Sequence, residues 1–158
     1  MIDYDLLFNR LEEQEHKLQF TEFTGDTALK IGMSLIKKAT LENKSIAIDI
    51  TKHNHQIFHF SFDGTSPDND YWIAAKRRTV ERFGKSSLFI FKMLEKEGKS
   101  IEERFHVSSS EFYGGGGAFP IIIKNVGVVG TITVSGLSEE EDHDYVIKAI
   151  SEYLEQRG

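Results

Sequence analysis

The sequence contains no cysteine, and no apolar run approaches the roughly 18 residues that a membrane-spanning helix needs. Disulfides, thiolate catalysis and cysteine-based zinc sites are therefore excluded. Basic residues are in deficit, with 19 Lys and Arg against 25 Asp and Glu, which argues against a nucleic-acid partner. The first residues, MIDYDLLFNR, become polar too early for a signal peptide, so we expect a cytoplasmic protein without a membrane partner.

Catalytic signatures are also missing, since neither HExxH nor GxSxG occurs. The glycine run Gly114–Gly117 follows a helix-like segment and precedes a strand, the reverse of a phosphate-binding loop or a dinucleotide fingerprint. Glycines at Gly115 and Gly116 instead allow positive φ and a close approach of the backbone to a ligand or a second subunit.

A chain of 158 residues with 39% hydrophobic and 28% charged residues predicts one folded domain over 1–158, with a substantial core. Hydrophobic periodicity and capping residues predict a mixed α/β fold. The expected helices are 3–17, 24–43, 67–83, 86–97 and a C-terminal one after 138, with short helical turns after 100 and 108. The expected strands are 18–23, 46–51, 57–62, 119–124 and 126–135.

The segment 46–62 predicts a β-hairpin, because isoleucine and then phenylalanine occupy alternate positions. Both apolar sets must lie on one side, which pairs Ile50 with Phe58 and places Asp49 opposite His59 on the other side. These two residues are candidates for a ligand site. A half-exposed charged pair on a sheet surface is the alternative.

The helix over 67–83 carries Arg77, Arg78 and Arg82, the one locally basic region of an acidic chain, while Lys76 falls on its inward stripe. Arginine binds carboxylates and phosphates with two parallel hydrogen bonds, so this cluster is a second candidate ligand site. A solvated helix face with intersubunit salt bridges is the alternative. The next helix is apolar on nearly all sides at 88–94, which suggests an oligomer interface.

The segments GTSPDNDYWIAAKRRTVERFGKSSL and GGGGAFPIIIKNVGVVGTITVSGLSEEEDH resemble the GlcG/HbpS-like family, also called the haem-degrading domain family, and in particular a small uncharacterised branch. The resemblance extends over roughly residues 10–155. It implies a profilin-like α-β-α sandwich, with an antiparallel sheet of about five strands flanked by helices. It also implies a homo-oligomer built from dimers.

The resemblance makes haem a candidate cofactor. His59 is then the first candidate iron ligand, followed by His106 and Tyr113, and the three arginines are candidates to pair with the propionates. Our first hypothesis is a small-ligand-binding or assembly protein without established catalysis. Haem binding or degradation is the second, and a protein-interaction adaptor is the third. The full set of predicted ligand-binding residues is Asp49, His59, Arg77, Arg78, Arg82, Tyr113, Gly115 and Gly116, with His59 and His106 as metal ligands if haem binds.

Overall fold

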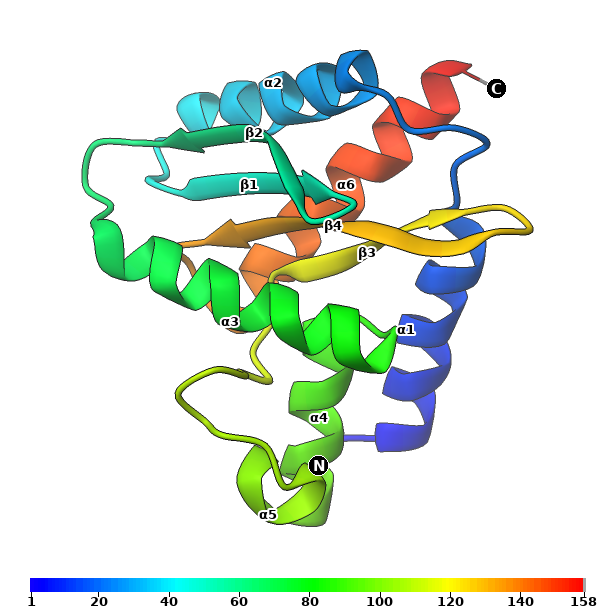
Figure 1. The fold of residues 1–158 in the computed structure, drawn as a ribbon, viewed down its shortest axis with the longest axis vertical. Coiled ribbons are helices and arrows are strands. Elements are labelled where there is room, and N and C mark those ends of the chain that lie inside the picture. Colours follow the sequence, from blue (N-terminus) through cyan, green and yellow to red (C-terminus); the bar gives the residue numbers. More distant parts are fainter. Residues whose placement is uncertain (158) are drawn as a thin grey trace.

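A computed structural model, which describes residues 1–157, shows an α-β-α sandwich around one antiparallel sheet (Figure 1). The strands are β1 (Ala47–Lys52), β2 (His55–Ser61), β3 (Ala118–Ile123) and β4 (Gly127–Ser135), in the order β2-β1-β4-β3. The helices are α1 (Tyr4–Lys17), α2 (Gly25–Leu41), α3 (Pro67–Phe83), α4 (Ser87–Glu97), α5 (Ile101–Phe105) and α6 (Glu139–Arg157). The prediction of a profilin-like α/β fold is confirmed. The sheet, however, has four strands and not five.

The missing strand is the segment 18–23, which was wrongly predicted to be extended. Only Phe20 pairs with the sheet, through a parallel bridge to Ile123 at the β3 edge. Its neighbour Phe23 is buried to the same extent, with 2% of its surface exposed. Both rings turn into the core and pack edge to face, so the segment cannot alternate as a half-buried strand does.

Helices α2 and α6 cover one face of the sheet, and α3 crosses the other face (Figure 1). The core lies between the sheet and the helices α2 and α6, because the alternate strand residues that point to that side are large and apolar. Its strand members are fully buried. They are Ile46 just before β1, then Ile48, Ile50, Phe119, Ile121, Ile132 and Val134. We call this side the apolar face.

The hairpin register follows the prediction, with Ile50 opposite Phe58 and Asp49 opposite His59. A bulge after Ile50 then shifts the register, so that Thr51 faces Gln56. Gly32 of α2 matters here, because a side chain at that position would overlap the Phe58 ring. The register therefore directs Asp49 and His59 toward α3.

Helix α3 begins and ends where the sequence predicts. Asn69 completes a capping box with Ser66, and Pro67 occupies the first turn. Gly84 ends the helix in the left-handed conformation, with φ of 68°. The positions of these two helix ends fix which side chains of α3 face the sheet.

Helix α4, which was predicted to be an oligomer interface because it is apolar on nearly all sides, is largely buried within the chain itself. Leu88, Ile90 and Leu94 are all under 10% exposed. Ile90 and Leu94 pack with α5 and the following loop, and Phe89 contacts Phe8 of α1 with ring centroids 5.0 Å apart. The apolar character of 88–94 is thus largely explained without a second subunit. Among residues 1–157, no helix is long and apolar enough to cross a membrane.

Candidate functional site

A hollow of about 330 Å³ opens between the β1–β2 hairpin and α3. It is lined by Asp49, Gln56, His59, Asp70, Ile73, Ala74 and Arg77. We call it the Asp49 hollow. It brings together the predicted hairpin pair, Asp49 of β1 and His59 of β2, with Arg77 of α3, which was predicted as part of a second candidate site.

Asp49 lies at the buried end of the hollow, with 2% of its surface exposed. Its Oδ2 accepts a hydrogen bond of 2.7 Å from the Thr51 hydroxyl, and its Oδ1 accepts one of 2.6 Å from Gln56 Nε2. Both donors are uncharged. The ion pairs found within residues 1–157 do not include Asp49, so its carboxylate is buried without a directly contacting cation.

His59 lies nearer the solvent and bonds to α3 rather than to Asp49. Its Nε2 is 2.9 Å from Oδ1 of Asp70, which belongs to the first turn of α3. The side chain of His59 is 32% exposed and that of Asp70 is 51% exposed. The register prediction placed His59 on the correct side of the sheet, but the carboxylate that orients the ring is Asp70.

Arg77 extends from α3 over β1. Its Nη1 donates to the Thr51 hydroxyl at 3.4 Å, and its Nε lies 3.4 Å from Oε1 of Glu81. The contact with Glu81 is close enough for charge attraction but not aligned as a hydrogen bond, so Nε is buried without a hydrogen-bond partner. The guanidinium is therefore positioned at the hollow with part of its donor capacity unused.

The sheet beneath α3 is polar although it is buried. Thr51, Thr131 and Thr133 are each at most 1% exposed, and the hydroxyls of Thr131 and Thr133 have no hydrogen-bond partner. Register places Thr133 beside Asp49 and Thr131 beside Thr51. Burying an unbonded hydroxyl costs free energy. We call this side the polar face, and its composition is not the one that maximises stability.

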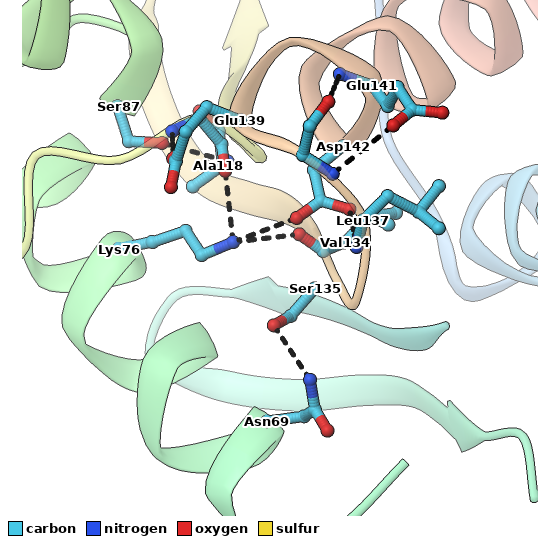
Figure 2. Close-up of polar contacts among 12 residues, drawn as sticks. Asn69, Lys76, Ser87, Ala118, Val134, Ser135, Leu137, Glu139, Glu141 and Asp142 are labelled. Carbon is cyan, nitrogen blue, oxygen red and sulfur yellow. Dashed lines mark hydrogen bonds and ion pairs between the residues drawn. The ribbon is translucent and has the colours of Figure 1, made fainter. Parts of the chain in front are cut away.

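A second buried polar group, the Lys76 cluster, links α3 to the glycine loop and α6 (Figure 2). Lys76 Nζ donates to the carbonyls of Gly116 at 3.0 Å and Val134 at 3.1 Å, and to Oδ2 of Asp142 at 3.4 Å. Burial raises the pKa of Asp142 to about 6 and lowers that of Lys76, and their mutual attraction opposes both shifts. Each of the three N–H groups of the Lys76 ammonium has an acceptor within the chain, so none is left for a ligand. The cluster therefore holds α3, Gly116, β4 and α6 together.

Tyr113, Gly115 and Gly116, which were predicted as ligand-binding residues, lie against Glu139 of α6 and do not line the Asp49 hollow. Tyr113 donates its hydroxyl to Oε1 of Glu139 at 3.1 Å, and burial, followed by the Glu139 charge, raises its pKa to about 12. The Gly116 N–H donates to the other carboxylate oxygen of Glu139. A side chain at Gly115 or Gly116 would overlap Glu139. The partner that approaches this loop is α6 of the same chain.

The remaining predicted residues lie apart from the hollow. Arg78 donates to the Glu111 carbonyl at 3.1 Å, and Arg82 lies over the Phe112 ring at 5.7 Å. His106 is exposed and ends α5 with φ of 58°. Of the basic cluster, only Arg77 reaches the hollow. The assignment of the other residues to a ligand remains a prediction.

The sequence analysis missed two polar residues of the lining, Gln56 and Asp70. Gln56 turns toward Asp49 only because the bulge after Ile50 shifts the register, and an alternation pattern does not reveal a bulge. Asp70 looked like an ordinary acidic residue in the first turn of a helix. Its spacing from Arg77, two turns along one helix face, was the signal available.

Comparison with known proteins identifies the group to which this chain belongs. A UPF0303 protein of Streptomyces coelicolor is 41% identical over 144 residues, covering 91% of each chain. The crystal structure of the Ybr137w protein superposes with a TM-score of 0.86 at 31% identity, covering 100% of this chain and 99% of that one. The PduOC:Heme complex shares the fold, with a TM-score of 0.67 at 14% identity, over 82% of this chain and 93% of that one. The family model described as haem degrading protein HbpS-like matches residues 23–151, and the chain therefore belongs to the HbpS-like family.

Proposed function

We propose that this protein binds a small polar ligand in the Asp49 hollow. The observation that carries the proposal is the convergence of Asp49, His59 and Arg77, from three separate elements, on one concave site. Its volume of about 330 Å³ lies at the lower end of the range for small-molecule sites, roughly 300–1,000 Å³. The ligand is therefore expected to be small.

The lining also defines the chemistry of recognition. Asp49 and Asp70 offer carboxylate oxygens, and Arg77 offers guanidinium N–H groups that its neighbours do not fully use. Ile73 and Ala74 supply the apolar part of the wall. Such a mixture orients a ligand that carries several hydrogen-bonding groups.

A screen of small polar metabolites by amide chemical-shift mapping tests the proposal. A ligand of this site should perturb amides of β1, β2 and the first turns of α3. Arg77→Ala should change the response, whereas Arg82→Ala, a change on the same helix outside the hollow, should leave it intact. A library that produces saturable shifts only elsewhere on the surface would refute the assignment.

Haem is the second candidate, supported by the description of the family model and by the fold shared with a protein solved as a heme complex. The residues of the hollow fit haem poorly. His59 Nε2 is engaged by Asp70, and Asp49 adds a second carboxylate to a lining that a largely apolar macrocycle would have to cover. Only Arg77 is present for a propionate.

Hemin titration separates the two candidates. We expect His59→Ala to leave any change of the Soret band as it is in the wild-type protein. A saturable Soret shift that is lost in His59→Ala and kept in His106→Ala would instead establish His59 as the iron ligand.

We also propose self-assembly, through the outer side of α2. Leu29 and Met33 are each 52% exposed there. Light scattering coupled to gel filtration should report more than one chain per particle, and Met33→Glu should lower that mass. A wild-type monomer would remove the proposal.

A further inference from the structure

Asp49 is an unusual group, because it is a buried carboxylate whose contacting partners are both neutral. Aspartate is seldom fully buried unless a cation accompanies it. A carboxylate offers about four lone-pair positions, and Thr51 and Gln56 occupy two. The structure thus leaves acceptor capacity and an incompletely balanced negative charge at the base of the hollow.

The other charged groups around the hollow do not remove this imbalance. Asp70 is a second carboxylate, and only its Oδ1 is engaged, by His59. Arg77 is the one lysine or arginine in the lining. It is 3.4 Å from Glu81, and it reaches Asp49 only through the Thr51 hydroxyl, which accepts from Arg77 and donates to Asp49. Acceptors and negative charge therefore predominate.

His59 adds to the same character. In the neutral tautomer whose Nε2–H donates to Asp70, the other ring nitrogen Nδ1 is a further acceptor. The walls then present two carboxylates and an imidazole lone pair against one guanidinium. These groups suit a ligand that carries hydrogen-bond donors and a positive charge.

We propose that the ligand of the Asp49 hollow carries a primary ammonium group, which binds against Asp49. This inference rests on the proposed binding function and specifies its ligand class. An ammonium offers three N–H donors, which suits the free positions of Asp49 together with Asp70 or His59. A volume of about 330 Å³ equals roughly eleven water molecules at about 30 Å³ each, so the ligand is a small amine rather than a peptide.

The experiment compares three probes of similar size on the intact protein, namely ethanolamine, ethylene glycol and acetate. They present an ammonium, a neutral diol and a carboxylate. Amide shifts of the 15N-labelled protein are followed at constant ionic strength, so that general salt effects cancel. Ethanolamine should give saturable shifts in β1, β2 and the start of α3, with the other two probes at least about tenfold weaker.

Variants then localise the charge that is responsible. Asp49→Asn keeps the shape of the side chain and should weaken ethanolamine binding at least about tenfold. Asp70→Asn should weaken ethanolamine binding less. This variant still tests the inference if Asp49→Asn folds poorly. Asp144→Asn removes an exposed carboxylate of α6 and should change nothing.

The possible failures are distinguishable. If ethylene glycol or acetate binds in the hollow as tightly as ethanolamine, or if Asp49→Asn binds ethanolamine as well as the wild type does, the ammonium inference is overturned and the binding function stands. If no probe perturbs the hollow, both are overturned.

Discussion

In the central strands β1 and β4, buried residues point to both faces of the sheet, but the two faces differ in composition. Ile48 is 0% exposed and points into the core under α2 and α6, whereas its neighbour Asp49 is 2% exposed and points toward α3. The same alternation places Ile132 on one face of β4 and Thr133 on the other. Large aliphatic groups fill the apolar face, and hydroxyls and a carboxylate occupy the polar face.

The apolar face contributes most of the burial free energy that specifies the fold. Burial of an aliphatic side chain contributes about 1.5–3 kcal/mol, whereas a buried hydroxyl without a partner costs free energy. Thr131 and Thr133 carry such hydroxyls. A sheet selected for stability alone would have apolar residues there. Stability alone therefore does not explain the composition of the polar face, which is consistent with the proposed binding function.

The largest effect should come from the Lys76 cluster, the part of the polar side where charges are paired. Lys76→Met leaves Asp142 buried without its cation, and such a break costs about 3–5 kcal/mol of unfolding free energy. Chemical denaturation measures the loss. The double variant Lys76→Met/Asp142→Asn, which keeps an acceptor for the Leu137 N–H, should recover most of it. A single variant as stable as the wild type would show that the pair is not structural.

On the apolar face, Ile48→Ala should lower the unfolding free energy by about 2–5 kcal/mol, because it removes buried methyl and methylene groups and leaves a cavity. Val126→Ala serves as the control, since Val126 is 72% exposed and its truncation should change stability by less than about 0.5 kcal/mol. Equal effects at the two positions would contradict the assignment of the core.

The pH dependence of the unfolding free energy tests whether an ionisable group on the apolar side, His143, is buried in its neutral form. His143 of α6 packs near Phe119 and bonds Gln14, and burial lowers its pKa from 6.5 to about 4. Below pH 6.5 the unfolded chain binds a proton that the folded protein does not, so stability falls as the pH decreases toward 4. The loss approaches about 3 kcal/mol, at about 1.36 kcal/mol per pKa unit.

Comparison with His143→Gln isolates this contribution. Asp142 acts in the opposite direction, because a folded pKa raised to about 6 stabilises the protein as the pH falls from 6 to 4. Asp142 is present in both proteins and cancels in the difference. If the two unfolding free energies change in parallel between pH 7 and 4, His143 is not buried as a neutral ring.

Sequence alone predicted the local features well. Alternation in the hairpin gave the pairing of Asp49 with His59, and helix spacing with its caps gave α3 and so the position of Arg77. What it could not give depends on tertiary placement. Phe20 pairs at a single position instead of forming a strand, since its ring is drawn into the core.

Polar contacts between segments that are distant in the sequence could not be predicted either. Lys76 was predicted to face inward, but its partner Asp142 lies 66 residues away on another helix. Asp70 meets His59 only because the first turn of α3 lies near β2 in the folded chain. Amphipathic patterns indicate which side of an element is buried and do not identify the element that covers it.

The most direct test of the contrast between the faces is the unfolding free energy of Asp49→Asn at pH 7, measured without added ligand. In Asp49→Asn the remaining oxygen still accepts from Gln56 Nε2, and the Thr51 hydroxyl can turn to accept from the new amide N–H. If Asp49 is retained for a ligand and not for stability, neutralising this buried charge should leave the protein as stable as the wild type or more stable. A loss of more than about 2 kcal/mol would contradict the account, because Asp49 would then be a structural residue.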